Sequence, residues 1–159
     1  MDTVSPAIRS RMMSRIRGSD TAPELAVRSC AHRLGLRFRL HVRNLPGRPD
    51  LVFPKHRKII FVHGCFWHRH GCKWTTTPKT RQEFWRQKFL ANQSRDRRNI
   101  AALEIDGWTV HVIWECETRD MAALEIRLAK LFGLDTLPAS VSRQTRPTRR
   151  PSGAPRSSR

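Results

Sequence analysis

Residues 63–72, with the sequence HGCFWHRHGC, hold three histidines, two cysteines and two large aromatic residues. Thiols and imidazoles at this density suit a soft divalent ion such as zinc. A polar segment bracketed by glycines leaves its aromatic side chains no obvious core to fill. The segment therefore predicts a loop that is held by a metal ion and carries an aromatic wedge.

A fourth ligand for that metal can come from a distant part of the chain. Cys65, His70 and Cys72 share the loop, and Cys116 follows a later apolar run. Four nitrogen and sulfur ligands that clamp a loop to a distant strand are typical of a closed structural zinc site. The Cys-x4-His-x-Cys spacing is not that of a standard zinc finger, and the cysteines could instead be small buried hydrophobic residues. We expect zinc here, and we expect Cys30 to be an inert core thiol.

The charge of the chain narrows the choice of partner. Lys and Arg number 31 against 13 acidic residues, which gives a formal net charge of +18. Such a field favours polyanions and makes their binding strongly dependent on salt. A ribosomal-type or membrane-surface protein would share this charge, but no basic amphipathic membrane helix is evident. We therefore expect nucleic acid as the partner.

The N-terminal sequence and the cysteines indicate a compartment. MDTVSPAIRS has no apolar core of signal-peptide length, and no run in the chain approaches the roughly 20 apolar residues that span a bilayer. Four cysteines in a reducing compartment are expected to be metal ligands or buried thiols. We expect a monomer in the bacterial cytoplasm, associated with the nucleoid and not with a membrane.

Helical and strand patterns alternate along the chain, which predicts an α/β domain. The run Ile59–Val62 is continuously apolar, as expected for a central strand buried on both faces. Thr21 and Glu24 have the spacing of a capping box. The expected helices are Ser5–Arg17, Thr21–Gly35, Thr80–Asp106 and Met121–Phe132, and the expected strands are Leu36–Val42, Asp50–Phe53, Lys58–His63 and Trp108–Trp114.

The last part of the chain differs in composition from the rest. From Thr136 on there are no acidic residues, six arginines and four prolines. This composition is typical of a disordered basic segment that makes loose phosphate contacts. We expect an N-terminal helix in residues 1–18, a folded domain in 19–135 and a disordered basic tail in 136–159.

Two histidines and an aspartate near the zinc ligands are candidates for chemistry. His63 closes the apolar strand, His68 lies beside Trp67, and both can be structural or can act as acid–base groups. Asp50 opens a neighbouring strand, where metal-dependent nucleases bind Mg²⁺ to polarise the scissile phosphate. Pro49-Asp50 is also a common turn dipeptide, so the residues alone leave both roles open.

Asp96 lies on the apolar face of the long expected helix. Trp85, Phe89, Ile100 and Leu103 form a narrow stripe at about 100° per residue, and Asp96 falls in its middle. An unpaired buried carboxylate is costly, so this one should be paired. The partner can be an arginine, although neighbouring arginines point elsewhere, or a catalytic imidazole, which we favour.

Several motifs together resemble the very short patch repair (Vsr) DNA mismatch endonucleases. The similarity covers about residues 5–133, and its combination of motifs is highly specific. It leaves the basic tail unexplained. The matching motifs are RSRMMSRIRGSDTAPE (9–24), Pro49-Asp50, FVHGCFWHRHGC (61–72), EFW (83–85), RDRR (95–98) and GWTVHVIWEC (107–116).

This resemblance implies a restriction-endonuclease-like fold of the PD-(D/E)xK type and strand-specific nicking at T·G mismatches left by deamination of 5-methylcytosine. It implies Asp50 as the Mg²⁺ ligand, His63 and His68 as acid–base and phosphate-facing groups, and Asp96 as support for His68. It places Glu24 near the active site, although capping already explains that residue. The implied zinc ligands are Cys65, His70, Cys72 and Cys116, the implied wedge is Phe66, Trp67 and Trp85, and the first helix, with Met12, Met13 and Arg15, would clamp double-stranded DNA.

The chain departs from the general nuclease signature at two positions. Phe61 and His63 stand where the second acid and the lysine would be, and the Vsr family shares this substitution. Mg²⁺ would therefore rely on Asp50, phosphates, water and the backbone carbonyl of Val62. Some relatives have threonine in place of Val62, whose loss is harmless if only the carbonyl binds.

Two further functions fit the same residues. The first is a zinc-braced protein that binds distorted DNA without cleaving it. The second is a zinc nuclease in which His63 and His68 hold the catalytic metal. Other mismatch-repair proteins are expected partners, but the sequence identifies none of them.

Overall fold

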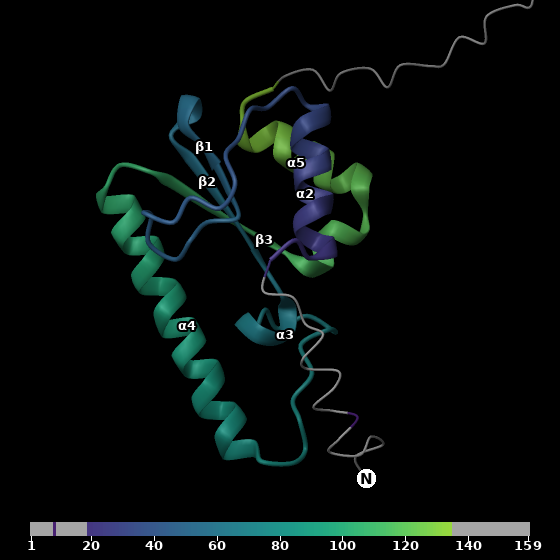
Figure 1. The fold of residues 1–159 in the computed structure, drawn as a ribbon. Helices are drawn as coiled ribbons and strands as arrows, with labels where there is room; N and C mark the ends of the chain where they lie inside the picture. Colours follow the sequence, from purple (N-terminus) through teal and green to yellow (C-terminus); the bar gives the residue numbers. More distant parts are fainter. Residues whose placement is uncertain (1–7, 9–18, 135–159) are drawn as a thin grey trace, which may run out of the picture.

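The computed structural model describes Ile8 and residues 19–134, in which a three-stranded mixed sheet lies between helices (Figure 1). Strand β1 spans Leu51–Phe53, β2 spans Lys58–His63 and β3 spans Thr109–Trp114. The order is β1-β2-β3, with β1 antiparallel and β3 parallel to the central β2. The expected α/β class with a mixed central sheet is confirmed.

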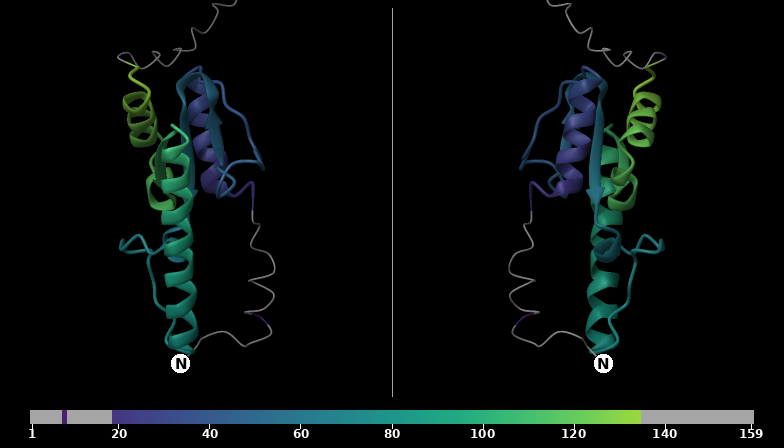
Figure 2. Two further views of the ribbon diagram at one scale, coloured as in Figure 1. Left: turned by 90° about the vertical axis from the view of Figure 1, so that its left-hand side faces the viewer. Right: turned by 90° about the vertical axis from the view of Figure 1, so that its right-hand side faces the viewer.

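Helices cover both faces of the sheet. Helices α2 (Ala22–Arg33) and α5 (Met121–Leu131) lie on one side, and α4 (Gln82–Ile105) lies on the other (Figures 1 and 2). The larger core lies under α2 and α5, and a smaller one is centred on Leu103 of α4. Since Ile60 belongs to the first core and its neighbours on β2 belong to the second, the central strand is buried on both faces, as expected.

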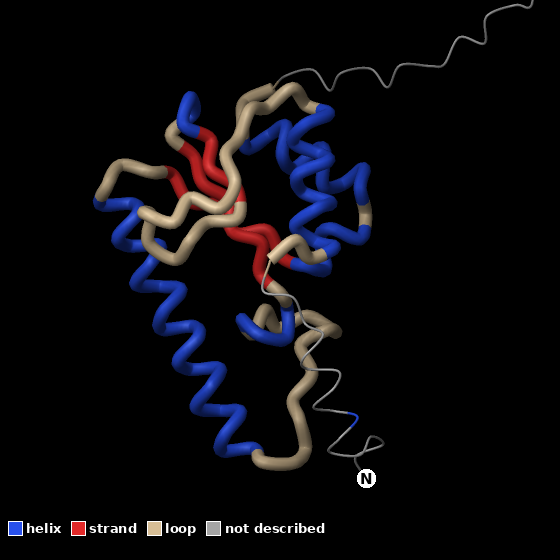
Figure 3. The backbone as a smooth tube through the Cα atoms, viewed as in Figure 1, coloured by secondary structure: helices blue, strands red, loops and turns tan. Residues whose placement is uncertain are grey.

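The long helix α4 extends beyond the sheet. Its C-terminal half packs against the strands, and its N-terminal half continues past their ends toward the short helix α3, Cys65–His68 (Figure 3). At 1.5 Å per residue its 24 residues span about 36 Å. The Arg57 guanidinium donates to the Asp106 carbonyl at 2.6 Å and lies over the Trp108 ring, which ties the C-terminal end of α4 to the β1–β2 turn.

The expected strand over Leu36–Val42 is wrong. Only Arg39 pairs with the sheet, in an isolated antiparallel bridge to Val52. Leu36 is buried, which explains the apolar signal, but His41 adopts a left-handed backbone with a φ of +55°. A residue with positive φ interrupts an extended run, so the segment becomes a loop along the edge of the sheet.

The expected capping box at Thr21 is only half correct. Thr21 is the N-cap of α2, but its side chain caps no backbone N–H. Its hydroxyl instead donates to the Glu24 carboxylate at 2.8 Å, and that carboxylate also accepts the backbone N–H of Asp20 at 2.9 Å. Glu24 thus holds the turn before the helix. The helix ends as expected before Gly35, which has a φ of +73°.

The other expected elements agree with the structure to within about two residues at each end. The helix expected over Ser5–Arg17 lies, except for Ile8, outside the described residues, as does the tail from 136 to 159. Among the helices that are described, none is long and apolar enough to cross a membrane.

Candidate active site and metal centre

Parallel pairing of β2 and β3 brings together the four expected zinc ligands, Cys65, His70, Cys72 and Cys116, and we refer to this group as the metal cluster. In this register His63 lies opposite Trp114 at the ends of the strands. Each strand then turns into a helical segment, and the second residue beyond the pair is Cys65 on one strand and Cys116 on the other. Residues 51 positions apart in sequence therefore meet at one edge of the sheet.

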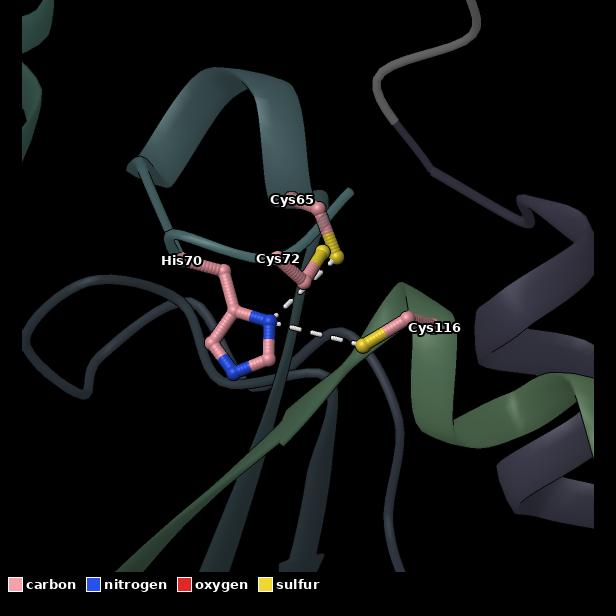
Figure 4. A group of neighbouring side chains, drawn as sticks. All are labelled: Cys65, His70, Cys72 and Cys116. Carbon is pink, nitrogen blue, oxygen red and sulfur yellow. Dashed lines mark hydrogen bonds between the residues drawn. The ribbon is translucent and has the colours of Figure 1, made fainter. Parts of the chain in front are cut away.

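The four expected ligands form one compact group (Figure 4). One ligand atom from each of Cys65, His70, Cys72 and Cys116 lies within 4.8 Å of all the others. His70 Nδ1 is 3.8 Å from Cys65 Sγ and 3.4 Å from Cys116 Sγ. In a tetrahedral zinc site, metal–ligand bonds of about 2.0 and 2.3 Å separate such N and S atoms by about 3.5 Å. The donor set and its spacing therefore fit a metal ion.

The thiols of this cluster have opposite acid–base properties. Burial raises the pKa of Cys65 to about 12, and hydrogen bonds with Cys72 and Cys116 add to that effect. Burial acts in the same sense on Cys72, but the backbone N–H of Trp74 and hydrogen bonds from neighbouring side chains outweigh it and lower that pKa to about 6. A divalent cation would stabilise the thiolate form of every cysteine in the group.

A second group of side chains lies on the other side of Trp114. The imidazoles of His63 and His68 stack with a centroid separation of 3.9 Å and an interplanar angle of 10°. His68 Nδ1 lies 2.5 Å from Asp96 Oδ2. Thus Asp96, the acid on the apolar face of α4, pairs with an imidazole and not with an arginine. The contact favours the His68 tautomer that carries a proton on Nδ1 and leaves Nε2 for exchange with a ligand.

His63 is the more enclosed of the two histidines. Only 8% of its surface is exposed, at the C-terminal end of β2. Burial and the neighbouring His68 lower the pKa of His63 to about 4, and the nearby Asp96 carboxylate opposes them only in part. The imidazole is therefore neutral at physiological pH.

Asp50 lies just before β1 and faces β2. Its Oδ2 accepts the backbone N–H of Val62 at 2.7 Å, which brings the carboxylate beside that peptide group. Burial raises the pKa of Asp50 to about 6 against the lowering effect of this hydrogen bond, and the charge of Glu24 adds to the rise. A carboxyl group with this pKa in a cavity is a candidate functional group.

Glu24 approaches Asp50 from helix α2. Its carboxylate is 6% exposed and binds the Arg28 guanidinium at 3.1 Å in addition to its contacts before α2. The spacing from Thr21 predicted a capping role for this residue, and the family resemblance implied a position near the active site. The structure allows both, because the capping carboxylate also lines the Asp50 cavity.

One cavity of about 370 Å³ brings these side chains together, and we refer to it as the Asp50 cavity. It lies at the end of the sheet where β2 and the parallel β3 finish and the antiparallel β1 begins. Its charged and titratable lining residues include Glu24, Arg48, Asp50, His63, His68, Arg95 and Asp96. Every catalytic candidate from the sequence therefore borders one cavity.

Trp114 separates the metal cluster from the Asp50 cavity. Its ring stacks on His70 at 4.3 Å with an angle of 13°, and it meets His63 edge-on at 5.5 Å. No sequence motif pointed to a role for this residue. Its place follows from the register of the two parallel strands, in which the last residue of β3 pairs with His63 at the end of β2.

The three aromatic residues expected to form a wedge pack together on α3 and α4. Phe66 meets Trp67 at 5.0 Å and Trp85 at 5.5 Å, and both contacts are edge-on. Phe89 lies beneath them, 5.3 Å from Phe66. Asn92, which no sequence motif singled out, donates from α4 to the Trp67 carbonyl at 3.1 Å and so ties the two helices together. All three wedge residues are half-buried, and Met12, Met13 and Arg15 lie outside the described residues.

Comparison with known proteins identifies relatives over most of the chain. A sequence model of the family described as DNA mismatch endonuclease Vsr matches residues 1–74. The chain is 51% identical over 131 residues to the type II nicking enzyme V.XorIIP of Xanthomonas oryzae pv. oryzae, which covers 82% of this chain and 96% of that protein. It is 46% identical over 118 residues to the DNA mismatch endonuclease Vsr of Escherichia coli, which covers 74% of this chain and 76% of that protein. A third relative is the type II nicking enzyme V.NmeAIP of Neisseria meningitidis, which is 37% identical over 82% of this chain and 93% of its own length.

Proposed function

The chain belongs to the Vsr family of DNA mismatch endonucleases, and we propose that it nicks one strand of DNA at T·G mismatches left by deamination of 5-methylcytosine. The observation that carries this proposal is the Asp50 cavity, where the carboxylates of Asp50 and Glu24, two stacked imidazoles and an imidazole-bound aspartate surround a single space. The net charge of +18 suits a DNA substrate. Because the proposed substrate is DNA, we infer that the protein acts in the bacterial cytoplasm, at the nucleoid.

In this proposal Asp50 and the backbone carbonyl of Val62 hold Mg²⁺, with phosphate and water completing its ligands. The Asp50 carboxylate accepts the Val62 N–H, and in an extended strand the N–H and C=O of one residue point to the same side, which supports this pairing. Oxygen ligands are the ones that Mg²⁺ prefers. When bound, the ion would polarise the scissile phosphate and lower the pKa of an attacking water.

The histidines and Asp96 would handle protons in the same cavity. Asp96 holds His68 through Nδ1, so that His68 Nε2 can give or take a proton at the phosphate. His63 stacks on His68 and limits the positions its ring can take. Glu24, on the opposite wall, would act on water or metal from its side of the cavity.

The Cys65–His70–Cys72–Cys116 cluster would hold zinc as a structural ion. Three cysteines and a histidine are a common ligand set for structural zinc. The ion would brace the loop after β2 against the segment after β3. We also propose that the domain, 19–135, is restriction-endonuclease-like, since a mixed sheet with a carboxylate at the end of a hairpin strand is compatible with that fold.

Phe66, Trp67 and Trp85 would enter the base stack beside the mismatch. Opening a base step costs on the order of a few kcal/mol, less at a mismatch, and each base–aromatic stack returns about 1–3 kcal/mol. Three aromatic side chains can thus open a wobble pair while sound duplex stays closed. Residues 1–18, with Met12, Met13 and Arg15, would clamp the DNA from the other side, and the basic tail, 136–159, would add loose phosphate contacts.

One arrangement in the structure favours a second candidate function. His63, His68 and Asp96 offer ligand atoms within 4.8 Å of one another, which is close enough to share a metal ion. In that case the protein would be a nuclease whose catalytic metal is held by the histidines, and Asp50 would be dispensable.

The deciding experiment is a nicking assay on a T·G duplex and a matched T·A duplex at fixed zinc content. The wild type is expected to nick only the T·G duplex and only with Mg²⁺, while Asp50→Asn is expected to be inactive. Activity that survives Asp50→Asn or Mg²⁺ removal favours the histidine-held metal. Binding of the T·G duplex without any cleavage would overturn the proposed activity.

A further inference from the structure

A second cavity, of about 310 Å³, adjoins the Asp50 cavity, and we refer to it as the arginine cavity. The two share a wall, because Glu24, Arg48 and Asp50 line both. Beyond that wall the remaining lining is mainly basic and consists of Arg28, His41, Arg43, Ser19 and Pro49. None of these basic side chains has a part in the chemistry proposed above.

The positive charge in the arginine cavity is only partly neutralised. Arg28 binds Asp20 at 2.5 Å and Glu24 at 3.1 Å, yet its Nε is buried and lacks a hydrogen-bond partner among the described residues. The Arg43 and Arg48 side chains form no ion pair or hydrogen bond within residues 19–134. A polar atom that is buried without a partner, near two guanidinium groups that form no ion pair within residues 19–134, suits an anionic ligand.

The backbone around this cavity is held in an unusual conformation. His41 and Arg48 both have left-handed φ values, +55° and +50°, although neither is glycine. Between them, Gly47 lies so close to α4 that a Cβ there would be 2.8 Å from Asn99 Nδ2. The loop is therefore fixed against the helix at a point where no side chain fits. Strained residues held in this way cluster at ligand-binding positions.

We propose that the arginine cavity binds a backbone phosphate of the nicked strand, adjacent to the phosphate that enters the Asp50 cavity. Guanidinium groups match phosphate oxygens in geometry and charge. Because the two cavities share a wall, a strand with one phosphate in the first brings its neighbour to the second. Such a contact sets the register of the strand over the catalytic groups. This inference rests on the proposed nicking activity.

Single neutral linkages in the substrate test the proposal. Four T·G duplexes are prepared, and each has a single methylphosphonate at one of the two phosphates before or the two phosphates after the nicked bond. Wild type, Arg43→Gln and Arg48→Gln are compared on each duplex. Arg37→Gln is the matched control, because Arg37 is exposed and lines neither cavity. The measurements are the dissociation constant, its salt dependence, and kcat and KM for nicking.

In the wild type, one linkage next to the nick is expected to raise the dissociation constant about tenfold when neutral. Arg43→Gln should do the same on the native duplex and lower the salt slope by about one. On the duplex with that neutral linkage, Arg43→Gln should raise the dissociation constant no further, because the contact is already lost. Arg37→Gln should change the dissociation constant by the same factor on every duplex, whichever linkage is neutral. Arg48→Gln, which shares a wall with the catalytic groups, should also lower kcat.

The phosphate site would be overturned if Arg43→Gln and Arg48→Gln each raised the dissociation constant by the same factor on the native duplex and on all four duplexes with a neutral linkage. If the wild type binds but does not nick T·G DNA, the proposed activity fails. The binding measurements then still decide the arginine cavity, because they need no cleavage. Arg43→Gln keeps the test valid if Arg48→Gln, at its strained position, unfolds.

Discussion

The metal cluster and the Asp50 cavity lie on opposite sides of Trp114 and differ in how their polar atoms are occupied. In the cluster, the three thiols and one imidazole face one another, so every donor is directed inward. In the cavity, Asp50 has the Val62 N–H as a partner and His68 has Asp96, so other atoms remain for a ligand. An inward-facing set suits a scaffold, and a partly satisfied set suits chemistry.

The largest expected effect comes from opening the scaffold. Cys116→Ser should lose one bound zinc per molecule and lower the free energy of unfolding on the order of several kcal/mol, because the loop after β2 is no longer tied to β3. Metal analysis and thermal unfolding measure both. Cys30→Ala is the matched control, since it removes a buried thiol outside the cluster and should keep the zinc. Full zinc retention by Cys116→Ser would contradict the scaffold.

A substitution in the Asp50 cavity should remove activity without the loss of stability expected for Cys116→Ser. Asp50→Asn should reduce nicking about 10³-fold or more and yet raise the thermal midpoint in the absence of Mg²⁺, because it removes a buried charge beside Glu24. Nicking rates and unfolding curves are measured on the same preparation, with Asp106→Asn, an exposed aspartate at the end of α4, as the control. A destabilised Asp50→Asn protein would indicate that this carboxylate is structural.

The short helix α3, which carries Cys65 of the metal cluster and His68 of the Asp50 cavity, should affect mismatch recognition more than the other residues of either region. Trp67→Ala should lower the preference for T·G over matched duplex about tenfold to a hundredfold and leave non-specific affinity largely intact, because one base stack is lost. Dissociation constants on both duplexes measure it. Trp74, exposed and stacked under Arg119, provides the control Trp74→Ala. Equal losses on both duplexes from Trp67→Ala would rule out the wedge.

The smallest effect should come from the residue between the regions. Trp114→Leu should keep zinc bound and lower kcat about tenfold with little change in KM, because His63 loses the ring that packs against it. Trp114→Phe should restore most of the rate. The imidazole NMR signals of His63 and His68 should shift in the leucine variant only, with Trp108→Phe as the control. Unchanged signals would show that the ring does not position His63.

The sequence was sufficient where a residue type permits few environments. The apolar run of β2, the acid on the apolar face of α4 and the four cysteine and histidine side chains each had few physical solutions. The structure buries the run, pairs the acid with His68 and gathers the four side chains into one group. Tertiary contacts decided the rest. The strand expected at Leu36–Val42 became a loop, because its left-handed residue cannot be recognised from composition.

The roles of Trp114 and Arg48 depend on distances between segments. Trp114 gains its place only from the register of β2 and β3, which no single stretch of sequence contains. Arg48 reaches the wall between the two cavities because Gly47 packs against Asn99, more than 50 positions away. Packing partners so far apart cannot be assigned from local patterns.

The most direct test of the division between scaffold and chemistry is the single-turnover nicking rate of protein whose cluster holds Co²⁺ in place of Zn²⁺, with Mg²⁺ held constant. Cobalt binds the same tetrahedral ligands, and its visible spectrum reports that the cluster is filled. A scaffold role predicts the same rate for both metals, and a loss of that rate in Asp50→Asn with either. A rate that changes with the metal in the cluster, or that survives Asp50→Asn, would contradict it.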